Sequence, residues 1–336
     1  MGELPSSSLL DSPADTRPAD RAATLDDVAQ CYRQFLGREV DSLETATGHL
    51  ADGPDLWTLI RRFTTAPEKQ LAQAFAASRY IQMTQDARGI DLALDGPQQE
   101  RLIAHIEAVW RRYGRDDAYY SVLTHPAYRA DRITAANVDH FYATGATELE
   151  EFEQLCRRNA VDPDPAWSVC ELGCGVARVG TAFARNFAVY LGVDISAEHL
   201  AMARARLDAE GAANAQLMLL PDFLQAGPGY DLFYSAIVLQ HNPPPIMRQL
   251  LDAGLAKLKP GGYAYFQLPC HLQDYSFDVD AYLAGVGRKN EMEMHALPQK
   301  EVFALLAKHG LTPLEVVPDG RIGPIGFSYA FFARKA

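Results

Sequence analysis

The stretch that decides the fold is ELGCGVARVG, residues 171–180. It follows a short apolar run, WSVCEL (167–172), and opens a helical pattern that continues to about residue 187. Gly173 and Gly175 let the backbone turn sharply and approach a ligand closely. The start of the following helix offers N–H groups that lack helical partners. The loop therefore predicts a nucleotide-type ligand at the carboxyl end of the first strand, with a plain strand–helix turn as the alternative.

Residues inside the loop exclude two common nucleotide motifs. The dinucleotide fingerprint G-x-G-x-x-G needs glycine where this chain has Arg178, and no Gly-Lys-Ser/Thr follows as a P-loop requires. Glu171 precedes the glycines, and a carboxylate there would repel a pyrophosphate but suits an ammonium group on the ligand. Asp194 ends the next predicted strand, where it is placed to accept hydrogen bonds from ribose hydroxyls.

From residue 167 onward, strand-like segments alternate with helical ones. The predicted strands are 167–172, 189–194, 215–220, 230–239, 262–269, 311–318 and 327–335, and predicted helices fill 197–210, 244–258 and 298–309. This alternation predicts an α/β fold in which helices cover both faces of a parallel sheet. The last two strands, joined by a glycine-rich loop, suggest an antiparallel hairpin at the edge.

The first 150 residues have a different, helical character. Predicted helices begin after Thr24 and continue at 41–50, 54–64, 67–85, 97–114 and 128–160, with an aromatic loop at 118–128. We expect a disordered tail at 1–20, an N-terminal helical module at 21–90, a helical linker and lid at 91–150, and the α/β domain at 151–336.

Composition and charge narrow the class of protein. The 336 residues carry 43 acidic and 31 basic side chains, a formal charge of −12, which disfavours nucleic acid as the main partner. No apolar run approaches the roughly 20 residues of a membrane span, and the N-terminus lacks the features of a signal peptide. We expect a cytoplasmic protein whose 5 cysteines are free thiols. Cys170 and Cys174 are interpreted as core residues, and we assign no metal.

With Glu171, Gly173, Gly175 and Asp194 in this order, residues 150–336 resemble the class I S-adenosylmethionine-dependent methyltransferases. Segments 221–224, 230–245 and 258–262 match the family's later motifs. The resemblance implies a Rossmann-like, seven-stranded, mostly parallel sheet with an antiparallel last strand. It also implies S-adenosyl-L-methionine as the cofactor, with the glycine loop under its methionine part.

The resemblance also implies further cofactor contacts. Asp194 would hold the ribose, with Ile195 beside it. Asp222 would face the adenine amine, next to Phe223, although Asp222 is alternatively a simple turn residue before a helix. Upstream, the aromatic segment 118–129 suits a lid in which Arg129 pairs with the cofactor's carboxylate, or else packs two helices onto the sheet domain.

Histidines are the candidate catalytic bases, because imidazole is the usual base near neutral pH. His241 follows the fourth predicted strand, and its structural alternative is to cap the next helix. His271 and His295 lie in a long connection at 270–297 that also holds Asp274 and Glu293. This connection predicts a base or divalent-metal site, or alternatively a solvated cap.

The N-terminal helical module resembles a small bacterial domain without defined activity, on the residues Tyr32, Leu36, Gly37, Arg38 and Asp41. That domain occurs in surface-layer proteins and beside enzymes that build or modify polysaccharides. The resemblance implies an interaction or self-association module.

The functional prediction is methyl transfer from S-adenosylmethionine to a sugar hydroxyl of a bacterial surface polysaccharide or glycan. The alternatives are an O- or N-methyltransferase acting on a small natural product, and a non-catalytic scaffold that binds S-adenosylmethionine. The predicted partners are thus a glycan or small-molecule acceptor, without nucleic acid or a transmembrane segment.

Overall fold

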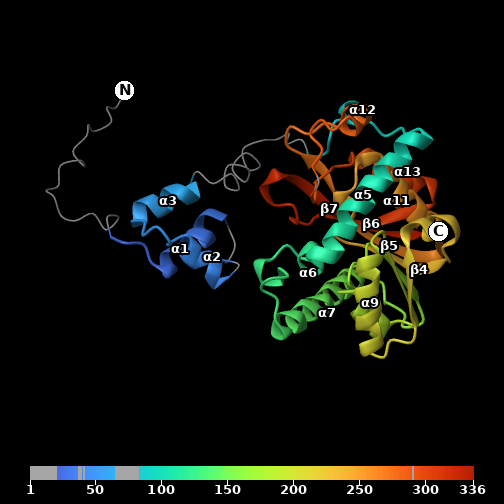
Figure 1. Cartoon of the computed structure of the whole chain (residues 1–336), viewed down its shortest axis with the longest axis horizontal. Coiled ribbons are helices and arrows are strands. Elements are labelled where there is room, and N and C mark those ends of the chain that lie inside the picture. Colours follow the sequence, from blue (N-terminus) through green and yellow to red (C-terminus); the bar gives the residue numbers. More distant parts are fainter. Residues whose placement is uncertain (1–20, 37–39, 41, 65–82, 290) are drawn as a thin grey trace, which may run out of the picture. The chain divides into compact units, whose positions relative to one another are not determined.

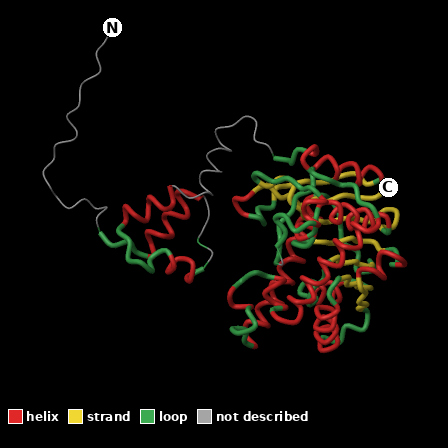
Figure 2. Tube along the Cα trace, turned by 45° about the horizontal axis from the view of Figure 1, so that its top comes forward, coloured by secondary structure: helices red, strands yellow, loops and turns green. Residues whose placement is uncertain are grey.

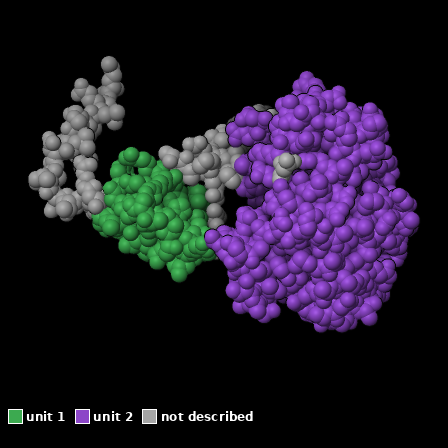
Figure 3. Space-filling view, in the orientation of Figure 1, with its two compact units in different colours: residues 1–81 green, residues 82–336 purple. Residues whose placement is uncertain are grey.

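The computed structural model describes residues 21–36, 40, 42–64, 83–289 and 291–336. The chain divides into two compact units, residues 1–81 and 82–336 (Figure 3). Residues 91–150, which the sequence set apart as a linker and lid, belong to the second unit. No helix in the described ranges is long and apolar enough to cross a membrane.

The described part of the first unit is helical, as predicted. It contains α1 (Leu25–Cys31), the π-helix η2 (Tyr32–Leu36), α2 (Leu43–Gly48) and α3 (Leu56–Thr64). Thr24 caps α1 in a reciprocal pair with Asp27, as its sequence position indicates. Val28, Leu59 and Phe63 form the centre of a small core. The predicted tail 1–20, most of the predicted helix 67–85 and residues Gly37, Arg38 and Asp41 lie outside the described residues.

The second unit is built on a seven-stranded sheet with the order β3-β2-β1-β4-β5-β7-β6 (Figures 1 and 2). Its strands are β1 (Ser168–Leu172), β2 (Val189–Asp194), β3 (Ala215–Leu219), β4 (Tyr230–Ser235), β5 (Leu258–Leu272), β6 (Leu311–Pro318) and β7 (Gly326–Lys335). The pairs among β1 to β5 are parallel, and β7 is antiparallel to both β5 and β6. The predicted α/β fold and terminal hairpin are confirmed.

Helices cover both faces of this sheet. They are α5 (Gly96–Asp116), α6 (Ala118–Val122), α7 (Ala135–Arg158), α8 (Gly180–Asn186), α9 (Ala197–Ala209), α10 (Leu220–Ala226), α11 (Pro244–Ala256), α12 (Val279–Leu283) and α13 (Gln299–Lys308), with short 3-10 turns η3 (Ala87–Gly89), η4 (Pro126–Tyr128), η5 (Leu239–His241) and η6 (Gly323–Ile325). Alternate side chains of one strand enter different cores: Phe233 packs with α5, α11 and α13, whereas Leu232 and Tyr234 pack with α7, α8 and α9. The 5 cysteines are buried and free, as predicted.

Several element boundaries differ from the prediction. Strand β4 ends at Ser235 and not at 239, because Ile237 has a left-handed backbone (φ 59°) and the chain then forms η5. The helix predicted at 128–160 begins at Ala135, after the N-cap residue Thr134, and ends at Arg158. It therefore crosses the domain boundary predicted at residue 150. The predicted loop 118–128 contains the short helix α6. These differences lie where capping and turn geometry outweigh the hydrophobic pattern.

Candidate functional site

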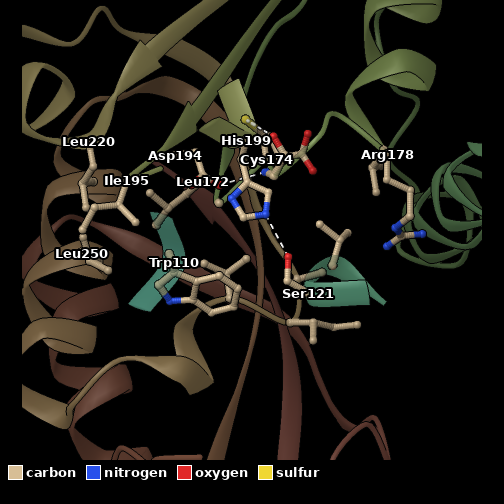
Figure 4. A pocket seen from close by; sticks show the side chains of 18 of the residues that line it. Trp110, Ser121, Leu172, Cys174, Arg178, Asp194, Ile195, His199, Leu220 and Leu250 are labelled. Carbon is tan, nitrogen blue, oxygen red and sulfur yellow. Dashed lines mark hydrogen bonds between the residues drawn. The ribbon is translucent and has the colours of Figure 1, made fainter. Parts of the chain in front are cut away.

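A cleft opens at the carboxyl ends of β1, β2 and β4. Its position is where open parallel sheets bind ligands. The glycine loop, the end of β2, the segment after β4, and helices α5 and α6 line it (Figure 4).

Two glycines form the floor of the cleft. Gly173 has φ +75°, and a Cβ there would lie 2.3 Å from Val238 Cγ1. Gly175 has φ +53°, and a Cβ there would lie 2.7 Å from Val122 Cγ2. Both positions therefore need glycine for conformational and steric reasons.

Asp194, at the end of β2, is fixed by backbone donors. One carboxylate oxygen accepts from Gly175 N–H (2.9 Å) and the other from Ser196 N–H (2.9 Å). The carboxylate therefore bridges the glycine loop and the start of α9. Ile195 lines the cleft beside it.

Glu171 lines the cleft from β1 and is 6% exposed. Its carboxyl group accepts a hydrogen bond from the Tyr190 hydroxyl at 2.6 Å. Burial raises the pKa of Glu171 to about 8, against the opposing effect of the Tyr190 hydrogen bond. Tyr190 was not among the residues predicted from the sequence. The signal was available, because Glu171 pairs with Gly192 in a parallel ladder, so that Tyr190, two residues earlier, shares that face.

Arg178 gives the cleft a charged end. Its guanidinium donates to Glu148 (2.8 Å) and Thr144 (3.2 Å), and Glu148 also accepts from Arg321. Burial alone would raise the pKa of Glu148, but the two guanidiniums outweigh it and lower the pKa. Figure 4 shows Arg178 at the side of the cleft opposite the apolar group Ile195, Leu220 and Leu250. The cleft thus has a charged end and an apolar end.

His199, a buried histidine that belongs to no sequence motif, also lines the cleft. The Ser121 hydroxyl donates to Ala118 O (2.8 Å), so it accepts from His199 Nε2 at 2.8 Å (Figure 4). This leaves His199 Nδ1 as an acceptor without a partner among the described residues. Trp110 lies beside the ring, with centroids 6.4 Å apart. Helices α5, α6 and α9 bring these residues together, which no local spacing reveals.

Three predicted cofactor residues do not line the cleft. Asp222 is exposed at the start of α10, and Phe223 is buried in the core, stacked on Tyr230. Leu220 lines the cleft from that segment instead. Arg129 pairs with Asp117 at 2.8 Å and lies over the Tyr120 ring at 3.5 Å, away from the cleft.

His241 does not line the cleft but shares a small hollow with Trp110. It stands at the end of a chain of hydrogen bonds in which the donor and the acceptor of each bond can be assigned. Ile237 N–H donates to Gln267 Oε1 (3.0 Å), and Gln267 Nε2 donates to Gln240 Oε1 (3.0 Å). Gln240 Nε2 then faces His241 Nε2 at 3.3 Å, so that nitrogen is an acceptor, and His241 Nδ1–H donates to Glu293 O at 2.8 Å. Burial lowers the pKa of His241 to about 4. The arrangement keeps the ring neutral, which favours positioning over proton uptake.

His295 belongs to a second polar cluster. Its Nε2 faces Glu293 Oε2 at 3.1 Å, and its Nδ1 faces the Tyr275 hydroxyl at 2.8 Å. The Tyr282 hydroxyl also donates to Glu293, at 2.6 Å. Burial would raise the pKa of Glu293, but its hydrogen bonds from His295 and Tyr282 outweigh it and lower the pKa.

His271 does not join this cluster. It lies against Phe327, with centroids 6.0 Å apart, and its buried Nδ1 has no partner among the described residues. Burial lowers the pKa of His271. The structure therefore brings Glu293 and His295 together without His271. In the described ranges, no group of three or more His, Cys, Asp or Glu side chains is arranged to hold a metal.

The doubly covered sheet, the glycine loop and the acids that end β1 and β2 define a Rossmann-like ligand-binding domain. Residues 169–262 match a protein family described as a methyltransferase domain. This part of the chain is thus similar to methyltransferase domains.

Two curated relatives match part of the chain. The ubiquinone biosynthesis O-methyltransferase of Pectobacterium carotovorum is 33% identical over 100 residues, 29% of this chain and 41% of that protein. The enzyme of that name from Thiobacillus denitrificans is 31% identical over 100 residues, 29% of this chain and 42% of its own. The match thus spans less than half the length of these relatives.

Two of the similar solved structures are methyltransferases. Magnesium protoporphyrin IX methyltransferase of Synechocystis, solved with bound S-adenosylhomocysteine, has a TM-score of 0.47 at 15% identity, covering 68% of this chain and 100% of that one. The N-methyltransferase NodS of Bradyrhizobium japonicum gives 0.44 at 17% identity, covering 69% and 98%.

Proposed function

We propose that the protein transfers a methyl group from S-adenosylmethionine to an oxygen atom of its acceptor. The observation that carries this proposal is the cleft in which Glu171, the glycine loop and Asp194 converge. Glu171 suits the ammonium group of the cofactor, Asp194 suits its ribose, and Ile195 and Leu220 suit its adenine. Arg178 Nε, which has no partner among the described residues, suits the carboxylate.

Methyl transfer is an in-line displacement that needs orientation more than covalent chemistry. The acceptor oxygen forms a bond to the methyl carbon while the bond from that carbon to sulfur breaks. Sulfur keeps the electron pair, so the sulfonium becomes the neutral thioether of S-adenosylhomocysteine. The hydroxyl proton must leave, which requires a proton acceptor near the oxygen.

We propose the Tyr275–His295–Glu293 cluster as this proton acceptor. The acceptor hydroxyl passes its proton to the Tyr275 oxygen while Tyr275 passes its own to His295 Nδ1. The ionised Glu293 then stabilises the imidazolium, the role of the third group in a catalytic triad. His241, which is held neutral, positions the adjoining segment, and His271 has no role in this scheme.

For the acceptor, we propose a sugar hydroxyl of a bacterial glycan. This part is supported by the resemblance of residues 24–85 to a module found beside polysaccharide-modifying enzymes. The first unit would then serve as an interaction module, and the second would carry the chemistry.

Two measurements test the proposal. Glycan and small-molecule extracts incubated with the full chain and S-adenosylmethionine should yield a product heavier by one CH₂ group. Replacing His295 by glutamine should abolish this product while calorimetry shows S-adenosylhomocysteine still bound. Cofactor binding without turnover on any extract would favour a scaffold, and normal turnover by His295→Gln would remove the proposed relay.

A further inference from the structure

A second hollow, the insertion cavity, lies within the connection after β5. Residues in the segments 275–282, 286–289 and 292–295 line it, and its free volume is about 530 Å³. The sequence predicted a base or divalent-metal site, or a solvated cap, in this connection, and the structure forms a half-open hollow there. None of its lining residues belongs to the cleft.

A small hollow, with a free volume of about 10 Å³, shares walls with both larger ones. It shares Ile106 and Trp110 with the cleft, and it shares Tyr282, Met292 and Glu293 with the insertion cavity. Trp110 and His241 face each other in this small hollow, with centroids 5.6 Å apart. The small hollow, which has room for about one water molecule, therefore adjoins both the cleft and the insertion cavity.

The segment between the cleft and the insertion is strained and held by buried polar groups. Ile237 lines the cleft with φ 59°, a conformation that β-branched residues rarely adopt. Gln267 and Gln240, which are 0% and 2% exposed, hold its N–H and continue to His241 and Glu293. Such an over-determined segment is typical of a preorganised site, and here it links the cofactor floor to a wall of the insertion cavity.

The polar groups of the insertion cavity indicate the chemistry of its ligand. Tyr282 donates its proton to Glu293, and Tyr275 donates to His295 when that ring is neutral, so both hydroxyl oxygens retain lone pairs for an incoming O–H. Phe277 and Met292 supply apolar surface.

Charge in the insertion cavity disfavours anionic ligands. Its lining includes two carboxylates, those of Asp278 and Glu293, and one ammonium group, that of Lys289. This ammonium group lies 3.6 Å from the Glu291 carboxylate. Glu293 is not free to bind an ammonium group either, because His295 and Tyr282 donate to one of its oxygens and Lys289 N–H to the other. A neutral ligand rich in hydroxyl groups fits this set best.

We infer that the insertion cavity binds the acceptor as a neutral, polyhydroxylated ring, whose reacting hydroxyl contacts Tyr275 and meets the cofactor's methyl group at the small hollow beside Trp110 and His241. This inference rests on the proposed methyl transfer and adds the place and chemical class of the acceptor. Ala281, on α12, lines the cavity. The exposed Ala284, at the end of the same helix, does not line it and provides a matched control position.

The test is saturation-transfer NMR on the full chain saturated with S-adenosylhomocysteine. The probes are methyl α-mannopyranoside and methyl α-rhamnopyranoside, with catechol and cyclohexylamine as the other ring classes. Wild type and Ala284→Trp should give saturation transfer to the glycosides, and Ala281→Trp should lose it. Ser276→Trp, at the exposed rim of the cavity, should lose it too and provides a second variant if Ala281→Trp does not fold.

Each outcome bears on one part of the inference. Glycoside signals that persist in Ala281→Trp and Ser276→Trp would overturn the location, and binding of only catechol or the amine would overturn the chemical class. Calorimetry with S-adenosylhomocysteine on the same samples distinguishes failure of this inference from failure of the proposed function. A wild-type protein that does not bind the cofactor would contradict the proposed function, whatever the acceptor.

Discussion

The cleft and the insertion cavity are built by opposite means. The cleft depends on backbone: two glycines at positive φ, and a carboxylate held by two N–H groups. The insertion cavity depends on side chains, in which Tyr275, Tyr282, Glu293 and His295 hold one another. Backbone requirements impose fixed spacing along the chain, whereas side-chain networks do not. A cofactor site can therefore remain constant while a neighbouring acceptor site changes.

Replacing Gly173 by alanine should have the largest effect. The new Cβ would collide with Val238, and a left-handed alanine costs roughly 1–2 kcal/mol. We expect calorimetry to show no binding of S-adenosylhomocysteine. Gly261→Ala is the matched control, because Gly261 has φ +77° with no atom within 4 Å of a Cβ. If both variants bind S-adenosylhomocysteine equally well, the added Cβ at Gly173 does not disturb the loop, and the expected clash with Val238 is wrong.

Replacing Asp194 by alanine should weaken cofactor binding without touching the insertion cavity. Two N–H groups would lose their acceptor, and the ribose would lose its partner, a change of about 1–3 kcal/mol. Titration should show affinity reduced by about 10- to 100-fold. Asp208→Ala, on the exposed side of α9, should leave the affinity unchanged. An unchanged affinity for Asp194→Ala would place the ribose elsewhere.

The pKa of Glu171 should make the stability of the ligand-free protein depend on pH. Because that pKa is raised from 4.5 to about 8, the stabilising effect of the neutral carboxyl is full below about pH 4.5 and is lost progressively as pH rises from there through 8. Thermal unfolding should show Glu171→Gln gaining stability over wild type at pH 9 but not at pH 5. A constant difference across this range would mean that Glu171 is ionised throughout.

Removing one hydroxyl from the insertion cavity should have the smallest effect. Tyr282→Phe leaves Glu293 with one donor fewer and costs about 1 kcal/mol of stability. With the acceptor found in the extract screen, initial rates should show a raised KM and unchanged binding of S-adenosylhomocysteine. A fall in cofactor affinity would show that the two hollows are not independent.

Much of the sheet and part of the site could be predicted from sequence. Strands β2 and β6 were predicted to the residue, because apolar runs bounded by turns carry their own limits. Glu171, Asp194 and the two glycines line the cleft because the motif fixes their positions relative to β1 and β2. The fold could therefore be predicted from local sequence patterns.

The remaining residues depend on tertiary contacts. His199, Ser121 and Trp110 come from three helices far apart in sequence, and their spacing carries no signal. Arg129 was assigned to the cofactor for its charge, but the nearby Asp117 and Tyr120 hold it elsewhere. Phe223 was assigned from its motif, although its ring packs into the core.

Calorimetric titration of S-adenosylhomocysteine into the full chain tests the central claim most directly. The account predicts saturable binding at one site, lost in Gly173→Ala and retained in Gly261→Ala and Ala281→Trp. A folded wild-type protein that binds neither S-adenosylhomocysteine nor S-adenosylmethionine would contradict it.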